Sequence, residues 1–180
     1  MLKRTLFLLS FFVGLASVQA QTYKPVGEKS AIKFSIKNFG IATGGDFKGL
    51  EGNIEFDPAN PSKIAFDVSV DANTVNTDND SRDGHLRKEE YFDVAKHPKI
   101  TFKSEKVAGK GSGFTVTGQL SIKGVTKTVS FPFTAVARDE GVHFEGNFKI
   151  NRRDFNVGGN SMVLGDEVTV TLSVFAKKGL

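Results

Sequence analysis

The sequence predicts an all-β domain of about eight antiparallel strands. Apolar and polar residues alternate with a period of two in one segment after another. In the first such segment, Ile32, Phe34 and Ile36 share one face and the polar residues between them take the other. Clusters of Gly, Pro, Asn and Asp separate the segments at spacings that allow neighbouring strands to pair without long crossovers. The 180 residues suffice for one domain with a sizeable core and are too few for two.

The first twenty residues have a different pattern, that of a secretory signal peptide. Lys3 and Arg4 precede an apolar run, and small residues ending in Ala20 follow it. The run itself, residues 6–15, is shorter than the roughly 20 residues that a membrane-spanning helix needs. We therefore expect a signal peptide over residues 1–20 and one domain over residues 21–180. Cleavage after Ala20 would yield a periplasmic or secreted protein without stable membrane insertion.

The exported chain is expected to be neither lipid-anchored nor strongly charged. It has no cysteine that could be acylated or form a disulfide. Loss of Lys3 and Arg4 lowers the basic count from 24 to 22 against 20 acidic residues, so the formal net charge falls from +4 to +2. Because Lys and Arg are spread singly along the chain, no basic patch favours nucleic-acid binding.

The expected strands follow one another in chain order, each with one apolar face. They cover residues 31–38, 52–57 (the weakest pattern), 63–71, 99–105, 113–124, 128–137, 142–151 and 167–178. Such strands form either a two-sheet sandwich or a barrel. Eight strands favour a barrel whose interior is filled by side chains or holds one small ligand. Pro132 lacks a ladder donor and predicts an edge or a bulge in its strand.

Phenylalanine dominates the large apolar residues, with 17 in the chain against no tryptophan. One interpretation is that these rings simply fill the core, since buried Phe is common. The other is that rings on the apolar phase of the strands line a cavity for a hydrocarbon. Together with the strand residue Val68, the wall would comprise Phe34, Phe56, Phe66, Phe102, Phe114, Phe144 and Phe148.

One segment, residues 76–92, breaks the strand pattern with a crowd of charges. Ser81 is expected to cap a short helix, in which Asp83 and Arg87 stand four apart in the favourable order. So short a helix needs docking to be stable. We expect it at the rim of the barrel, where it closes one end, with Leu86 and Phe92 pointing into the cavity and the polar residues outward.

The same segment contains only incomplete versions of a calcium-binding loop and of a hydrolytic triad. Asp78, Asp80 and Glu89 mimic three positions of a calcium loop, but the glycine that such a loop requires is missing. Ser81, Asp83 and His85 include the residue types of a hydrolytic triad, yet all three come from one local turn. The three histidines lack metal-ligand spacing. No metal site, cofactor or catalytic residue is therefore expected.

Several separated motifs resemble the YceI-like family of bacterial periplasmic polyisoprenoid-binding proteins. The resemblance runs from residue 23 to 176 and includes "SRDGHLRKEEYFDVAKHPKITFKS", "VTGQLSIKGVTKTVSFPF" and "NRRDF". One departure is Asn156, where the family usually has glycine. Because asparagine tolerates a left-handed backbone, we expect the turn to survive.

The resemblance implies an extended, lipocalin-like antiparallel barrel that holds a long isoprenoid or another amphiphile and does no chemistry on it. The expected function is that of an exported carrier or scavenger. Partners would be a polyisoprenoid, a quinone or a fatty derivative, and a homodimer is left open. For a phosphate headgroup the candidate contacts are Arg82, His85 and Arg153.

Three alternatives remain open at this point. Arg82 could instead form a salt bridge with Asp93 at the rim, or Arg153 one with Asp154 or Asp83. The protein could be an enzyme for a small hydrophobic substrate, with His85 as acid or base and Asp83 orienting it. It could also be an envelope protein that acts through a partner surface, in which case its interior would be solidly packed.

Overall fold

Nine strands and one α-helix form the fold that the computed structural model describes over residues 21–179. The strands are β1 (Gln21–Pro25), β2 (Ala31–Asn38), β3 (Ile41–Phe56), β4 (Ala65–Asn76), β5 (Lys99–Lys110), β6 (Gly113–Ile122), β7 (Val125–Arg138), β8 (Gly141–Asn151) and β9 (Leu164–Lys178). The helix is α1 (Asp80–Leu86), and the 3-10 turns are η1 (Gly27–Lys29), η2 (Pro61–Lys63) and η3 (Arg152–Phe155). The expected signal peptide lies outside the described residues.

Antiparallel pairing closes these nine strands into an eight-stranded barrel, because β1 and β2 share one place in the ring. Strands β2 to β9 pair in order around the sheet, and the pairing of β3 with β4 completes the ring. The short β1 lies in line with β2, because both pair with β3 on one side and with β9 on the other. The predicted all-β, eight-stranded antiparallel barrel with a short helix is therefore confirmed.

The largest differences from the predicted strands concern β1 and β3. Strand β1 was missed because its five residues are too few to display a period of two. Strand β3 begins at Ile41, eleven residues before the predicted start at residue 52. Its first half is rich in glycine and lacks clean alternation, so only its pairing with β2 and β4 identifies it as strand.

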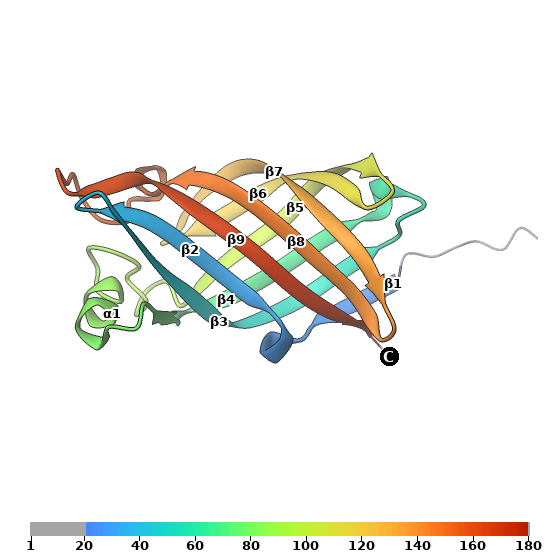
Figure 1. The fold of residues 1–180 in the computed structure, drawn as a ribbon, viewed down its shortest axis with the longest axis horizontal. Coiled ribbons are helices and arrows are strands. Elements are labelled where there is room, and N and C mark those ends of the chain that lie inside the picture. The colour runs from blue at the N-terminus through green and yellow to red at the C-terminus, as the bar shows by residue number, and fades with distance from the viewer. Residues whose placement is uncertain (1–20, 180) are drawn as a thin grey trace, which may run out of the picture.

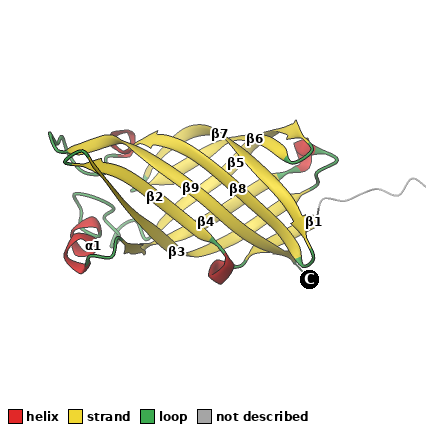
Figure 2. Cartoon of the chain, viewed as in Figure 1, coloured by secondary structure: helices red, strands yellow, loops and turns green. Residues whose placement is uncertain are grey.

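The barrel is elongated, and its two ends differ (Figure 1). One end, here called the helix end, carries α1, the β2–β3 turn, the β6–β7 turn and the loop from η3 to β9. The opposite end, called the terminal end, carries β1, the last residues of β9 and the β5–β6 and β7–β8 turns. Figure 2 shows that strands make up nearly all of the wall. No helix within residues 21–179 has the length and apolarity needed to cross a membrane.

Pro132 marks the point at which two neighbouring strands part. It pairs with Thr115 of β6, whereas pairing between β7 and β8 starts one residue later, at Phe133 and Gly146. The absent N–H of Pro132 therefore costs no ladder bond to β8. Beyond this point η3 fills the widening gap, with the buried Phe155 packed in a cluster that includes Val129 and Phe148.

The terminal end is filled by a packed aromatic core. Phe56 meets the rings of Tyr23, Phe114 and Phe144 edge to face, with centroids 5.2 to 6.3 Å apart. Each such pair contributes about 0.5–1.5 kcal/mol beyond its buried area. Ala176 of β9 is fully buried in the same cluster. This end of the barrel is consequently closed.

The α1 segment is held by different residues from those predicted. The Asn79 side chain, rather than Ser81, caps the helix by accepting a bond from the Arg82 N–H. Arg87 does not pair with Asp83 but donates to the carbonyls of Asn73 and Val75 in β4. The backbone of a neighbouring strand thus takes the place of the expected intrahelical pair, because it lies within reach of the longer side chain.

Candidate functional site

A cavity of about 270 Å³ runs inside the barrel. Its wall follows the period of two; on β9, for example, every second residue from Val168 to Val174 borders it. Leu164, at the start of β9, and Val174, further along the same strand, both border the cavity. At a rise of about 3.3 Å per residue and a strand tilt of about 40° from the barrel axis, the strand between them spans roughly 25 Å along that axis. The cavity is therefore long and narrow, a shape that suits a chain better than a compact molecule.

Eight of the ten predicted wall residues border this cavity. They are Phe34, Phe66, Val68, Leu86, Phe92, Phe102, Phe144 and Phe148. Phe56 and Phe114 share the same inward face but do not border it. Their rings pack against each other at the terminal end, where the barrel interior is already filled. Alternation identified the face of each residue correctly but not its position along the barrel axis.

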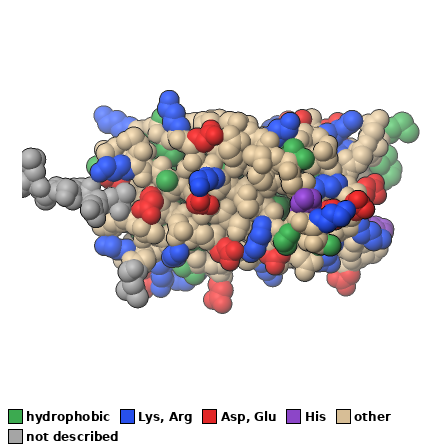
Figure 3. All heavy atoms as spheres, turned by 180° about the vertical axis from the view of Figure 1, so that it is seen from behind, with side chains coloured by type: hydrophobic (Ala, Val, Ile, Leu, Met, Phe, Trp, Pro, Cys, Tyr) green, Lys and Arg blue, Asp and Glu red, His purple; other side chains and the backbone are tan. Residues whose placement is uncertain are grey.

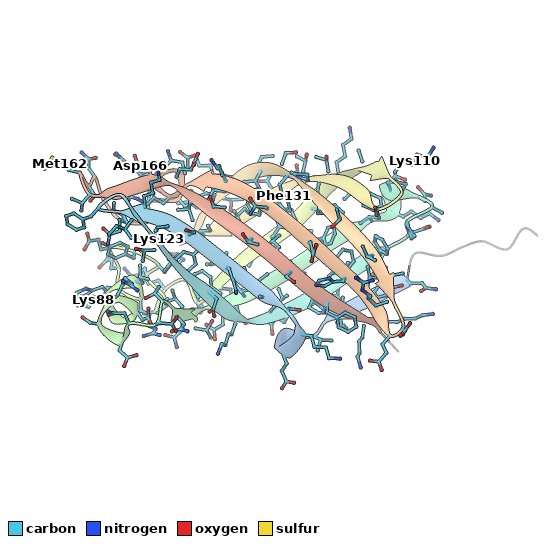
Figure 4. All side chains as sticks on the ribbon, viewed as in Figure 1. Lys88, Lys110, Lys123, Phe131, Met162 and Asp166 are labelled. Atoms are coloured by element: carbon cyan, nitrogen blue, oxygen red, sulfur yellow. The ribbon has the colours of Figure 1, made fainter. Side chains whose placement is uncertain are left out.

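Other wall residues were missed by the sequence reasoning, among them Phe47, Phe131, Phe133 and Phe155. Phe131 stacks on Phe148 with centroids 4.1 Å apart and also contacts Phe102. Figure 4 places Phe131 about midway along the barrel. A signal was present, because Val129, Phe131 and Phe133 alternate with polar residues and Pro132 in the predicted strand. Pro132 in the same strand predicts an edge or a bulge, so the pattern alone did not assign Phe131 to the cavity wall.

The cavity reaches the surface at the helix end. Pairing of β3 with β4 stops at Asp46 and Asn76, so the first five residues of β3 have no partner strand on that side. Half-buried residues on both sides of this interruption border the cavity. They are Asn38, Thr43 and Leu164 on the β2–β3 side and Arg82 and Leu86 on the α1 side, and we call this opening the mouth.

Arg82, one of the three predicted headgroup contacts, borders the cavity at the mouth. Its Nε donates to Thr77 Oγ1 at 2.8 Å and its Nη2 to the Thr77 carbonyl at 2.7 Å. Thr77 in turn donates its backbone N–H and its hydroxyl to the buried carboxylate of Asp83. Within residues 21–179 Thr77 is the only acceptor for Arg82, so three of its five N–H groups remain for a ligand.

The other two predicted headgroup residues lie elsewhere. His85 is exposed on α1 and does not border the cavity. Arg153 lies on the outer side of η3, where its Nη1 donates to Asn160 Oδ1 at 3.0 Å and stands 3.9 Å from Asp166. The suggested salt bridges of Arg82 or Arg153 with Asp83, Asp93 or Asp154 do not form within the described residues. The ionic partner of η3 is Asp166.

Arg152, which sequence reasoning passed over, is the buried cation of the site. Only 4% of its side chain is exposed, and it borders the cavity. It donates to the carbonyls of Val157, Gly158, Gly159, Leu164 and Gly165 and to Asp166 Oδ1 at 2.8 Å. This one side chain therefore holds the loop between η3 and β9. Which of two adjacent arginines points inward depends on the turn geometry of η3, which the sequence pattern does not reveal.

Ionised pairs are found on the exposed surface of the barrel. Lys99 Nζ lies 2.8 Å from Glu51 Oε1, and Lys177 Nζ lies 2.8 Å from Glu140 Oε2. The hydrogen bond and charge of each lysine lower the pKa of the paired carboxylate. None of these groups borders the cavity. Across residues 21–179, no cluster of His, Asp and Glu could hold a metal ion.

Comparison with known proteins gives consistent matches along the whole barrel. The profile of the YceI-like domain matches residues 23–176. Protein YceI of Salmonella arizonae is 32% identical over 177 residues, which cover 94% of this chain and 93% of that protein. The crystal structure of BcnA from Burkholderia cenocepacia superposes with a TM-score of 0.81 at 27% identity, covering 85% of this chain and 99% of that chain.

A polyisoprenoid-binding domain from Saccharophagus degradans is similar in fold alone. It superposes with a TM-score of 0.71 at 19% identity and covers 88% of this chain and 99% of that chain. At this identity the likeness extends to the barrel architecture and not to individual residues.

Proposed function

This chain belongs to the YceI-like family, and from that premise we propose that it is an exported, non-catalytic carrier or scavenger of a long-chain isoprenoid or a similar amphiphile. The observation that carries the proposal is the long cavity, walled almost wholly by apolar side chains and open at one end. A solidly packed interior, which a protein acting only through its surface would have, is absent from the described residues. The likeness in fold to a polyisoprenoid-binding domain supports the same ligand class.

Burial of the tail supplies the binding free energy. Each CH₂ group moved from water into such a wall contributes about 0.8 kcal/mol, so about twenty chain carbons yield on the order of 16 kcal/mol. Association and ordering cost roughly 4–15 kcal/mol of this, so the tail alone accounts for binding in the micromolar range or tighter. The headgroup then selects among ligands instead of anchoring them.

Arg82 is the residue that makes this selection. It stands at the mouth with three unused N–H groups, and the Asp83–Thr77 pair fixes its orientation. A guanidinium held in this way matches a phosphate or pyrophosphate, because it donates two parallel bonds to paired oxygens. Prenyl phosphates are therefore favoured over quinones and fatty derivatives.

Absence of catalysis is part of the proposal. In the enzyme alternative Asp83 orients His85, but the Asp83 carboxylate accepts from Thr77 instead. His85 itself is exposed and stands apart from the cavity wall. A ligand inside the barrel would thus meet mainly apolar side chains and two arginines, which are not suited to proton transfer at neutral pH. Glu145 also borders the cavity, but 63% of its side chain is exposed and its Oε1 lies 3.7 Å from His143 Nδ1.

Export rests on the sequence of residues 1–20, which precede the described barrel. Basic residues, a short apolar run and small residues before Gln21 form a cleavable leader. The proposed site of action is the periplasm or the medium. Mass spectrometry of protein recovered from the periplasmic fraction of its host checks this: a first residue other than Gln21, or recovery in the cytoplasm only, would contradict it.

The central experiment identifies the ligand directly. Protein purified from its own host is extracted with organic solvent, and the extract is examined by mass spectrometry. We expect a prenyl lipid or a related amphiphile. The stripped protein is then titrated with prenyl phosphate, quinone and fatty amide. Failure to take up any of the three would overturn the carrier function.

A matched pair of variants ties uptake to the cavity. Val170 of β9 borders the cavity, whereas the next residue, Thr171, is exposed on the outer face. Val170→Phe fills the space and should lower the affinity at least about tenfold, at an overpacking cost of roughly 1–3 kcal/mol in stability. Thr171→Phe adds a ring of the same size outside and should leave binding unchanged. Equal affinity in both variants would place the ligand elsewhere.

A further inference from the structure

Exposed apolar side chains gather at the helix end. Of the five large apolar residues that are exposed within residues 21–179, four lie in or beside two adjacent turns. Phe39 (73% exposed) lies in the β2–β3 turn and Ile41 (71%) is the first residue of β3 after it, whereas the fully exposed Met162 and the partly exposed Val163 belong to the loop before β9. The Phe39 N–H donates to the Val163 carbonyl at 2.8 Å, so the two turns form one unit, here called the apolar tip.

The apolar tip projects from the molecule beside the mouth. Figure 4 places Met162 at the outermost point of the helix end, and Figure 3 shows hydrophobic side chains at that end of the opposite face. Asn38 and Leu164, which pair with each other, adjoin Phe39 and Val163 in sequence and border the cavity. The tip is therefore the outer lip of the same opening through which a ligand enters.

The charge around the tip is also distinctive. Residues 37–45 and 155–165, which make up both turns, contain no Asp or Glu. Their one charged residue is Lys37, and their polar residues are short amide and hydroxyl side chains. The two turns themselves therefore present no carboxylate to an anionic bilayer, and a lysine beside apolar side chains is favourable there.

The exposed area argues against a stable protein partner on the tip. Four side chains of this size and exposure present roughly 500 Å². A standard protein–protein interface buries about 800 Å² on each side. A projecting tip of this area is better matched to shallow insertion among lipids, where apolar side chains enter about 5–10 Å into the boundary between headgroups and acyl chains.

We infer that the apolar tip docks the barrel reversibly on a lipid bilayer, with the mouth facing the membrane. In this pose an oily ligand moves between the acyl chains and the cavity past Asn38 and Leu164 without crossing water. Docking goes beyond the carrier function, because it concerns the surface from which the ligand is collected or to which it is delivered. It needs no bound ligand and is testable on the empty protein.

Flotation with vesicles of phosphatidylethanolamine and phosphatidylglycerol tests the inference. A chain that begins at Gln21 is used, since it contains the whole described barrel and lacks the apolar run of residues 6–15. We expect this protein to float with the vesicles. The double variant Phe39→Ser, Met162→Ser should bind at least about tenfold more weakly. Val136→Ser, at the one exposed large apolar residue that lies away from the tip within residues 21–179, is the matched control and should float like the unmodified protein.

A spectroscopic test reports on the same contact. The chain has no tryptophan, so a single introduced indole is the only one that emits. On addition of vesicles, the emission of Phe39→Trp should shift to shorter wavelength, whereas that of Val136→Trp should not. Equal shifts, no shift at residue 39, or equal flotation of the serine variant would each overturn the docking pose.

Two measurements distinguish membrane docking from dimerisation and from the carrier function. If the unmodified protein sediments as a dimer and the serine variant as a monomer, the tip is a contact between two copies and the inference fails. Uptake of prenyl phosphate delivered from ethanol measures the carrier function independently of membranes. Normal uptake without flotation would overturn docking alone, whereas flotation without uptake would overturn the carrier function alone.

Discussion

Single side chains decide how the open end of the barrel is built, and Arg152 is the clearest case. Its guanidinium satisfies five carbonyls and one carboxylate within the loop that leads from η3 into β9. The planar fork of arginine makes these contacts possible, because an ammonium group has only three donors around one point. The same loop ends in Met162 and Val163 of the apolar tip, so Arg152 also fixes that surface.

We expect Arg152→Lys to be far from conservative. The buried carbonyl of Val157 and several part-buried carbonyls would lose their partner, at a cost of up to about 1–3 kcal/mol each, so the free energy of unfolding should fall by roughly 2–5 kcal/mol. Urea denaturation measures this. The neighbouring Arg153→Lys is the control, because 46% of that side chain is exposed, and it should change stability by less than about 0.5 kcal/mol. Similar losses in both variants would contradict the assigned role of Arg152.

Arg82 is expected to control selectivity and not affinity for the tail. Arg82→Gln removes the charge at the mouth, so prenyl phosphate should bind about tenfold or more weakly, while the matching prenyl alcohol binds as before. Titration of both ligands into the stripped protein gives the comparison. Arg153→Gln, on the outer side of η3, serves as the control. Equal weakening for phosphate and alcohol would mean that Arg82 acts only through the structure of the mouth.

The sequence predicted the role of a residue correctly where that role depends on its own backbone conformation. It failed where the role depends on how the residue packs against distant parts of the chain. Asn156 adopts the left-handed conformation expected of it, with φ 55° and ψ 30°, so the turn survives without glycine. Asparagine was a sufficient signal because few residues tolerate that region. The cap of α1 and the buried arginine of η3 were missed. In each case adjacent residues have side chains that could play the same role, and only the folded path of the backbone determines which of them does.

At the level of elements, the pairing of β3 with β4 closes the barrel, and it depends on a close backbone approach. Gly52 faces Val68 across this pair with φ 128°. A Cβ atom at Gly52 would clash with the Asp67 carbonyl oxygen and would lie 2.7 Å from the Val68 Cα. No side-chain movement relieves such a contact, because both atoms belong to the backbone.

Gly52→Ala should therefore weaken the closing pair. We expect a loss of about 2 kcal/mol or more, with faster amide hydrogen exchange concentrated in β3 and β4. Gly113→Ala is the matched control, since no heavy atom lies within 4 Å of its added Cβ. It should stay within about 0.5 kcal/mol of the unmodified protein. An equal increase in amide hydrogen exchange over all strands would mean that the β3–β4 pair does not open independently of the rest of the barrel.

Element prediction followed the strength of the local pattern. The strands with clean alternation, such as residues 31–38 and 113–124, correspond to β2 and β6 within two residues at each end. Residues 41–51 of β3, which include three glycines, had no such pattern. Their strand conformation comes from their partners, and partner identity is not encoded in a single segment.

For the whole molecule, a ligand bound in the cavity is expected to raise stability. A ligand that binds only the folded barrel, at about 100 times its dissociation constant, stabilises it by about 2.7 kcal/mol. For a domain of this size we expect the melting temperature to rise by about 5–10 °C. Calorimetry with and without prenyl phosphate measures the shift. Val170→Phe should show a smaller shift, and an equal shift in that variant would point to a site outside the cavity.

The architecture as a whole was predictable because every strand repeats the same alternation, whereas the shape of the interior was not. Alternation places Phe56 and Phe66 on the same inward face, yet only Phe66 borders the cavity. The difference arises from the position of each ring along the axis and from the neighbours that crowd it. Those neighbours come from strands distant in the chain.

The arrangement of the first and last strands has a practical consequence. Tyr23 pairs with Lys178, and the Gly179 N–H donates to the Thr22 carbonyl at 2.8 Å, so both ends of the described chain emerge side by side at the closed end. A short linker could join them, and a new start between Lys110 and Gly113 would preserve every neighbour in the sheet. Immobilisation on a sensor surface through either end would leave the opening free, which makes the barrel a convenient scaffold for capturing oily compounds.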